Sequence, residues 1–126
     1  AVEYAKHRIQ FGHPIFALPV VQNKLAEMAI QVEAARALTY ATARTIDGGA
    51  KDYTEASAMT KVFASDVAMK VTVDAVQILG GAGYMRNYPV EKMMRDAKIT
   101  QIYEGTNEVL RETIALELRK RKARRD

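Results

Sequence analysis

Residues 19–49 read PVVQNKLAEMAIQVEAARALTYATARTIDGG, and this stretch decides the fold. Its apolar residues recur at intervals of three and four positions, which is the period of one face of an α-helix. They are Val21, Leu25, Met28, Val32 and Ala35. Pro19 suits the first turn of a helix, and Asp47-Gly48-Gly49 ends the pattern. The stretch therefore predicts one long amphipathic helix.

A second long helix is predicted after this one. The same periodicity resumes in the segment that ends at Gly80-Gly81. Its apolar residues are Met59, Val62, Phe63, Val67, Val73, Val76 and Leu79. Asp52 and Glu55 have the spacing of a capping box at its start, with Thr54 as the alternative N-cap. The connection between the two helices is short, so we expect them to pack antiparallel.

Shorter helices are predicted on both sides of this pair. Residues 1–10 have the pattern of the last turns of a helix, which Gly12 and Pro14 terminate. Two further helices are expected, from Val90 to Lys98 and from about Thr106 to Leu118. No alternating β-branched run flanks a tight turn, so no strand is predicted. The expected fold class is all-α, an antiparallel up-and-down bundle of about four helices.

Composition limits the classes of function that remain. The 126 residues are 48% hydrophobic and 27% charged, which is typical of a single soluble domain. The absence of cysteine excludes a disulfide scaffold, a thiol nucleophile and cysteine-ligated metals, and only His7 and His13 could supply imidazole ligands. No apolar run approaches the roughly 20 residues of a membrane helix. Because the chain opens within a helical pattern, we expect it to be part of a longer protein.

The net charge of +4 comes from the end of the chain, and the rest is nearly neutral. The basic residues there are Arg119, Lys120, Arg121, Lys122, Arg124 and Arg125. Such a tail can bind nucleic acid or an anionic surface, but no aromatic residue is interleaved to stack on bases. We therefore interpret it as the solvated end of the last helix, where the helix dipole favours cations, and expect no nucleic-acid partner.

Alanine is dense in both long helices, which predicts close approach of helix axes. The residues are Ala26, Ala29, Ala34, Ala35, Ala37, Ala41 and Ala43, then Ala56, Ala58, Ala64, Ala68 and Ala75. Such a face suits either the interior of the bundle or a helix of another subunit, and the sequence leaves both open. Met28, Met59 and Met69 have core-like spacing and are interpreted as core residues.

Two breaks between helices carry groups suited to binding a cofactor. In the segment from Arg8 to Pro14, the Arg8 guanidinium could bind a phosphate and Phe11 could cover a flat ring; a helix-terminal arginine favoured by the dipole is the alternative. The segment from Gln77 to Tyr84 has glycines that would let backbone N–H groups approach a ligand. It does not follow a strand, so a dinucleotide-binding Rossmann turn is excluded, and a glycine-terminated helix is the alternative.

A third break carries a candidate base. Residues 102–108 read IYEGTNE, in which Thr106 is a natural N-cap for the last helix. Glu104 lies just before that cap, beside Gly105, which lets a substrate come close. A carboxylate flanked by apolar and aromatic residues becomes a base near neutral pH if it is desolvated. Spacing alone does not assign this role to Glu104 and favours a structural one.

Taken together, the three segments resemble the carboxy-terminal helical domain of the acyl-CoA dehydrogenases. The matching residues are Arg8, Phe11, Gly12, Pro14 and Ile15, then Gln77, Ile78, Gly80, Gly81, Gly83 and Tyr84, then Arg95, Asp96, residues 101–108 and Arg111. Their order, spacing and types agree over nearly the whole chain. The resemblance implies that residues 1–126 form the C-terminal domain of a larger enzyme that also has an amino-terminal helical and a middle β-domain.

The resemblance also implies a reaction and a set of roles. A flavoenzyme of this family uses FAD to oxidise a saturated acyl-CoA to its trans-2-enoyl thioester, and passes the electrons to an electron-transfer flavoprotein. Glu104 matches the catalytic base, and Gly105 lies at the substrate. Arg8 and Phe11 match contacts to the FAD of a neighbouring subunit. The segment of Gln77, Ile78, Leu79, Gly80 and Gly81 matches contacts along its adenosine portion, and Thr106, Asn107 and Glu108 match FAD contacts after the base.

Such enzymes form homo-oligomers, dimers or tetramers, through this domain, and act in the bacterial cytoplasm or the mitochondrial matrix. From the composition we expect no metal site and no membrane partner. Two alternatives remain open. The chain is a helical association module that is inactive in isolation, or it belongs to a related acyl-CoA oxidase or enoyl-CoA reductase.

Overall fold

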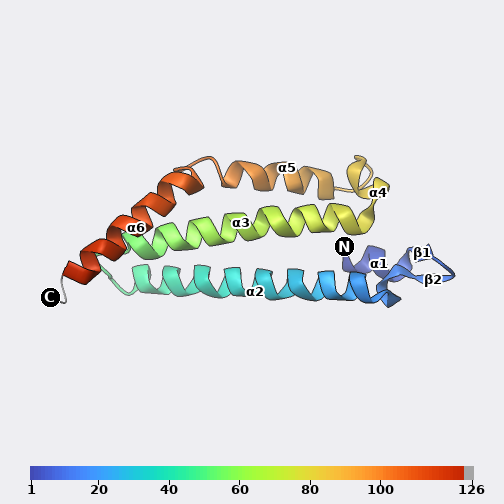
Figure 1. Ribbon diagram of the computed structural model, residues 1–126, viewed down its shortest axis with the longest axis horizontal. Coiled ribbons are helices and arrows are strands. Elements are labelled where there is room, and N and C mark those ends of the chain that lie inside the picture. Colours follow the sequence, from blue (N-terminus) through green and yellow to red (C-terminus); the bar gives the residue numbers. More distant parts are fainter. Residues whose placement is uncertain (124–126) are drawn as a thin grey trace.

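The computed structural model describes residues 1–123 of the chain, with side chains described through residue 120. Of the basic tail, Arg124 and Arg125 lie outside the described residues. The two long helices are α2 (Pro19–Asp47) and α3 (Thr54–Leu79), which run antiparallel and side by side (Figure 1). Pro19 is the first helical residue of α2, and Gly48 is its C-cap. Both predicted long helices are therefore confirmed.

Helix α3 is the central element of the bundle. It packs against α2 on one side and against α5 (Val90–Thr100) on the other, and α6 (Asn107–Ala123) packs across its N-terminal half (Figure 1). The expected all-α fold class is thus confirmed. One detail differs, because α6 continues obliquely beyond α5 and does not return alongside it.

The largest buried cluster lies at the end of the bundle where the chain begins. It joins α1 (Val2–His7) and the following turn to the N-terminal part of α2, the C-terminal half of α3 and the start of α5. Its buried members are Ala5, Ile15, Leu25, Met28, Ala75, Ile78, Leu79 and Val90. Met59 and Met69 are partly buried, so all three methionines with core-like spacing contribute to packing.

Polar contacts fix the alignment of α2 with α3 at two points. The Lys24 ammonium lies 2.7 Å from the Asp74 carboxylate near one end of the pair. Toward the other end, the hydroxyls of Thr42 and Thr60 are 2.6 Å apart, and Thr42 is buried. Because these pairs cross between the helices at separated positions, sliding one helix along the other would break both.

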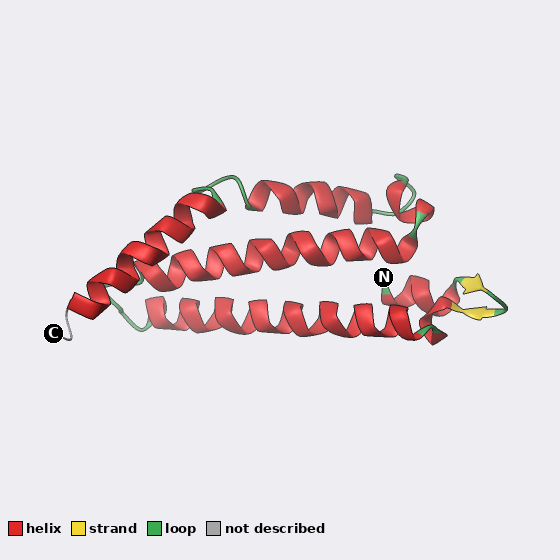
Figure 2. Cartoon of the chain, viewed as in Figure 1, coloured by secondary structure: helices red, strands yellow, loops and turns green. Residues whose placement is uncertain are grey.

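The first segment differs from its sequence-based prediction. Helix α1 ends at His7, and residues 9–14 form a hairpin of two short strands, β1 (Ile9–Gln10) and β2 (His13–Pro14), followed by the 3-10 turn η1 (Ile15–Ala17) (Figure 2). Ile9 pairs with Pro14, and Gln10 with His13. The expected helix is therefore confirmed over residues 2–7 but ends before Gln10, and the prediction that no strand forms was wrong. The physical reason is the turn, because Phe11 and Gly12 have φ values of +53° and +83°, the two left-handed residues of a tight hairpin.

The ends of α3 also add detail that the pattern did not predict. Tyr53 is the N-cap, rather than Asp52 or Thr54, and the Asp52 carboxylate accepts a hydrogen bond from the Thr54 amide at 3.3 Å. At the other end Gly80 stops the helix as expected, but a one-turn helix, α4 (Gly81–Tyr84), follows directly. No helix in residues 1–123 combines the length and apolarity needed to cross a bilayer.

Candidate functional site

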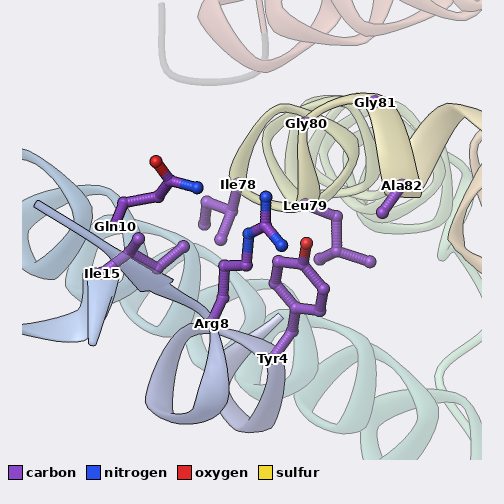
Figure 3. A pocket seen from close by; sticks show the side chains of 9 residues that line it. All are labelled: Tyr4, Arg8, Gln10, Ile15, Ile78, Leu79, Gly80, Gly81 and Ala82. Atoms are coloured by element: carbon purple, nitrogen blue, oxygen red, sulfur yellow. The ribbon is translucent and has the colours of Figure 1, made fainter. Parts of the chain in front are cut away.

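The hairpin and the junction of α3 with α4 enclose an open groove of about 400 Å³. It is lined by Tyr4, Arg8, Gln10, Ile15, Ile78, Leu79, Gly80, Gly81 and Ala82. In Figure 3 the Arg8 guanidinium and the Gln10 amide extend from the α1–hairpin side toward the glycine corner, which is the junction of α3 and α4 at Gly80 and Gly81. The structure thus brings together two segments that are about 70 positions apart in the sequence and were predicted separately as cofactor contacts.

The backbone around Arg8 is fixed, whereas its side chain is exposed. The Arg8 amide donates to the Tyr4 carbonyl at 2.9 Å, and the Arg8 carbonyl accepts from the Ile15 amide at 2.8 Å. The edge-to-face contact of Tyr4 with Tyr88, at 5.5 Å between ring centroids, holds the adjoining wall of the groove. A guanidinium presented in this way can donate two parallel hydrogen bonds to a phosphate.

The glycines of the corner differ in what they do. Gly80 has φ of +61°, which a residue with a side chain adopts only at a cost. A Cβ on Gly83 would lie 2.6 Å from the Leu79 Cβ, so internal packing requires that glycine. A Cβ on Gly81 would meet no protein atom within 4 Å. Internal packing therefore does not account for Gly81, which is one of the residues that line the groove.

Within the two segments that meet here, two of the predicted cofactor residues do not line the groove. Phe11 lies at the tip of the hairpin with 84% of its surface exposed. Gln77 is exposed one turn before the corner, and its carbonyl accepts from the Gly80 amide at 3.2 Å. Sequence reasoning in turn missed Tyr4, Gln10, Ile15 and Ala82, whose contribution depends on the hairpin and on α4.

The predicted base lies in the loop of residues 101–106, between α5 and α6. The backbone N–H of Asn107 donates a hydrogen bond to the backbone carbonyl of Gln101 at 3.0 Å and closes this loop. Glu104 is exposed and has φ of +53°, and Gly105 has φ of +89°. The left-handed pair turns the chain sharply and leaves the carboxylate at the outside of the turn. Beside it is a second cavity of about 340 Å³ between α3 and α6, lined by Glu104 with Tyr53, Thr54, Ser57, Ala58, Lys61, Leu110 and Thr113.

The three residues after Gly105 have different environments. Thr106 accepts a hydrogen bond from the Val109 amide at 3.3 Å, which confirms it as the N-cap of α6. Glu108 is exposed in the first turn, where its own backbone N–H and the Thr106 hydroxyl lower the pKa of its carboxyl. Asn107 is only 3% exposed, and its amide contacts Ser65, Asp66 and Lys61 of α3. Its side chain therefore fastens α6 to α3.

Asp66 is the centre of that contact. Partial burial acts to raise the pKa of its carboxyl, but hydrogen bonds from Gln101, Asn107 and Arg111 outweigh burial and hold the pKa below its ordinary value. Lys61, Ser65 and Asp66 were not recognised from the sequence. A signal was present in Ser65, a polar residue that shares the buried face of α3 with Ala58 and Val62 and is 5% exposed.

The groove and the Glu104 loop are separate sites. They lie at opposite ends of α5, whose 11 residues span about 16 Å (Figure 1). The structure therefore unites Arg8 with residues 78–81, and Glu104 with Gly105 and Thr106, but does not bring these two groups together. No group of three or more histidine or acidic side chains in the described part of the chain is placed to hold a metal ion.

Known proteins resemble this chain in sequence and in fold. The family model described as "Acyl-CoA dehydrogenase, C-terminal domain" matches residues 1–118. An acyl-CoA dehydrogenase of Bacillus subtilis is 58% identical over 111 residues, which are 88% of this chain and 29% of that protein. The solved structure of butyryl-CoA dehydrogenase from Megasphaera elsdenii has a TM-score of 0.90 at 53% identity, covering 93% of this chain and 30% of that one.

A more distant structure, the FAD complex of PigA, has a TM-score of 0.88 at 32% identity and covers 95% of this chain and 31% of that one. The chain thus spans less than a third of the length of the relatives it matches. The family model over residues 1–118, the bacterial relative and the solved structures all indicate the same family. The chain belongs to the acyl-CoA dehydrogenase family, in the part that forms the C-terminal domain.

Proposed function

We propose that this chain is the C-terminal domain of an FAD-dependent acyl-CoA dehydrogenase and that Glu104 is the base that removes the α-proton of the thioester. The observation that carries the proposal is the Glu104 loop. It presents an exposed carboxylate at a left-handed turn, beside a cavity, on a loop whose two ends are tied to α3.

The residues of the groove fit an FAD molecule. The Arg8 guanidinium matches a pyrophosphate in charge and geometry, and the open side of Gly81 leaves space for a ligand to approach the backbone. The family resemblance assigns these residues to the FAD of a neighbouring subunit and assigns Thr106 and Glu108 to the other flavin contacts. Their separation by the length of α5 agrees with contacts to two different flavins. Asn107 has no such surface and supports the loop instead.

The chemistry requires a base stronger than an exposed carboxylate. The α-proton of a thioester is weakly acidic, so the pKa of the base must be raised and the developing enolate stabilised. Glu104 is exposed in this chain, so the desolvation must come from bound acyl-CoA, the flavin and the rest of the enzyme. The backbone N–H of Glu104 is the proposed donor to the thioester oxygen. FAD, when bound, accepts the hydride from the β-carbon.

Replacement of Glu104 tests this role in the full-length, flavin-loaded protein. Glu104→Gln keeps the shape of the side chain but removes the proton acceptor, so acyl-CoA should still bind while flavin reduction falls by orders of magnitude. The measurement is anaerobic bleaching of the flavin by saturating butyryl-CoA, with bound FAD quantified in the same sample. Bleaching at a near-normal rate would remove Glu104 from the mechanism.

The proposal extends to partners. Electrons leave such a flavin to an electron-transfer flavoprotein, and the enzyme assembles as a homo-oligomer through this domain. In isolation the domain is expected to be inactive, because most of the flavin site lies in other domains. An oxidase of the same family would share the Glu104 chemistry, and rapid reoxidation of the reduced flavin by oxygen would identify it.

A further inference from the structure

We propose that Lys61 and Asp66 of α3 are positioning residues that hold the Glu104 loop in the conformation needed for proton abstraction. This inference rests on the proposed role of Glu104. The loop cannot be fixed by burial of its own side chains, because Ile102 is 49% and Tyr103 51% exposed, and Glu104 is exposed as well. Glu104 also has a left-handed backbone that residues with side chains adopt at a cost, so other contacts must maintain it.

Lys61 holds the loop just after Glu104. Its ammonium donates to the Gly105 carbonyl at 2.8 Å and to the Asn107 side-chain oxygen at 2.8 Å. The Gly105 carbonyl belongs to the residue that directly follows Glu104 in the left-handed turn. Loss of the ammonium would leave both oxygens without this donor and would release the backbone on which the carboxylate is mounted.

Asp66 holds the loop at both of its ends. One carboxylate oxygen accepts hydrogen bonds from the side-chain amides of Gln101, at 2.7 Å, and Asn107, at 2.8 Å. The other oxygen accepts a hydrogen bond from the Arg111 guanidinium. Gln101 precedes Glu104, and Asn107 follows it. Ser65 adds a hydrogen bond at 2.8 Å from the Asn107 amide. The loop is therefore anchored before and after the base on two consecutive turns of one helix.

The anchoring helix is itself rigidly held. Helix α3 has 26 residues and lies between α2 and α5, with α6 across it. Lys61 lines the same cavity as Glu104, so the anchor lies directly beside the proposed base. Proton abstraction requires the reacting atoms to be placed within about half an ångström, and a loop held by charged hydrogen bonds to a packed helix meets this need.

The test compares two lysines of α3 in the full-length, flavin-loaded protein. Lys61→Met removes the ammonium and keeps the chain length of the side chain. Lys70→Met is the matched control, because the Lys70 side chain is 52% exposed and its ammonium lies 3.9 Å from the Glu27 carboxylate, which is a long, solvent-exposed ion pair. We expect Lys61→Met to slow anaerobic flavin reduction by butyryl-CoA at least about tenfold per bound flavin, with FAD content and butyryl-CoA affinity within about twofold of the unmodified protein. Lys70→Met should leave the rate of flavin reduction, the FAD content and the butyryl-CoA affinity unchanged.

A double variant separates positioning from general stability. If Lys61 acts through Glu104, adding Lys61→Met to Glu104→Gln should slow the residual reduction by less than about threefold, whereas independent effects would multiply. Asp66→Asn keeps the shape of the side chain and should slow reduction in the same way as Lys61→Met. A rate per bound flavin within about threefold of normal in Lys61→Met, or full multiplication in the double variant, would overturn the proposal.

The Glu104 and Lys61 variants test the two proposals separately. A near-normal rate in Glu104→Gln alone contradicts the proposed function, whereas a slow Glu104→Gln with a near-normal Lys61→Met contradicts only the positioning role. If Lys61→Met gives no folded flavoprotein, Lys61→Gln replaces it, since a neutral amide can still donate to one of the two oxygens. Its rate per bound flavin should lie between those of the unmodified protein and Asp66→Asn, and a near-normal rate would again overturn the proposal.

Discussion

Asp66 connects the stability of the chain to pH. Its folded-state pKa is lowered because three hydrogen bonds outweigh partial burial, so the ionised carboxylate is the form that the fold stabilises. A group with a depressed folded pKa contributes its full stability above the unfolded pKa, about 3.9 for aspartate, and loses it as the pH falls through the lower folded value. The contribution of Asp66 is therefore complete at neutral pH, begins to fall near pH 4 and is lost at lower pH, once the pH has passed the folded pKa.

Asp66→Asn tests this assignment on the chain itself. At pH 7 the variant should be less stable by about 1 kcal/mol, a modest value because the Asp66 side chain is 37% exposed. At pH 3 the difference should shrink, because the Asp66 carboxyl of the unfolded chain is then mostly protonated and folding must release that proton. Urea unfolding at the two pH values measures both numbers. An equal loss at both would show that the charge of Asp66 is not what the fold uses.

Asn107 shows the limit of inference from a motif. The family resemblance predicts a flavin contact for Thr106, Asn107 and Glu108 alike, because the three are adjacent in the sequence. Successive residues at the start of a helix point in different directions, and Asn107 faces α3 while Glu108 faces solvent. The motif located this loop, but only the packing of α6 on α3 separates the residues that can meet a ligand from the residue that supports them.

Among the elements, the long helices were predictable and the short ones were not. The apolar periodicity of residues 19–47 and 54–79 extends over many turns. It is strong enough to predict the helices without knowledge of their tertiary contacts. The hairpin of residues 9–14 depends on two left-handed residues, one of them Phe11, and phenylalanine carries no signal for that conformation. Helix α4 occupies four residues, which is too short for any period. These two short elements build the groove, so the sequence named only five of its nine lining residues and did not place them.

The glycines of α4 allow the fold and the groove to be tested separately. Gly83→Ala places a Cβ 2.6 Å from the Leu79 Cβ and 2.9 Å from the Val76 carbonyl oxygen, so it should destabilise the chain by about 1–3 kcal/mol. Gly81→Ala meets no protein atom within 4 Å and should leave stability unchanged or slightly higher. Chemical denaturation of both variants measures the contrast.

In the full-length protein we expect the opposite order for FAD retention, with a larger effect of Gly81→Ala than of Gly83→Ala. Gly81→Ala fills space at the groove and should release FAD more readily, as a fluorescence titration of free flavin would show. Equal stability losses for Gly81→Ala and Gly83→Ala would contradict the packing argument, and unchanged flavin retention in Gly81→Ala would argue against a ligand at this corner.

On the scale of the whole molecule, many large apolar side chains of the described helices are exposed. Figure 1 looks down the shortest axis, and α2, α3 and α5 lie beside one another in that view. The outward face of α2 carries exposed small and apolar residues at helical spacing. They are Ala26, Ile30, Ala34, Ala37 and Ala41. Ile30 is 63% exposed on this stripe, which lies opposite the face that packs on α3.

An apolar stripe of small residues suits close packing against another helix, and this leads to the last prediction. We expect the chain to self-associate through this face of α2, because alanines let two helix axes approach closely and the exposed isoleucine would be buried. Ile30→Glu places a charge in the middle of the stripe and should weaken association at least about tenfold, since an unpaired buried carboxylate costs more than the lost contact. The matched control is Val109→Glu on α6, where a valine that is 52% exposed lies outside the stripe. Sedimentation velocity over a range of concentrations, with circular dichroism to verify helix content, distinguishes the variants. A chain that sediments as a monomer at high concentration, or equal effects of Ile30→Glu and Val109→Glu, would show that this face of α2 is not the contact.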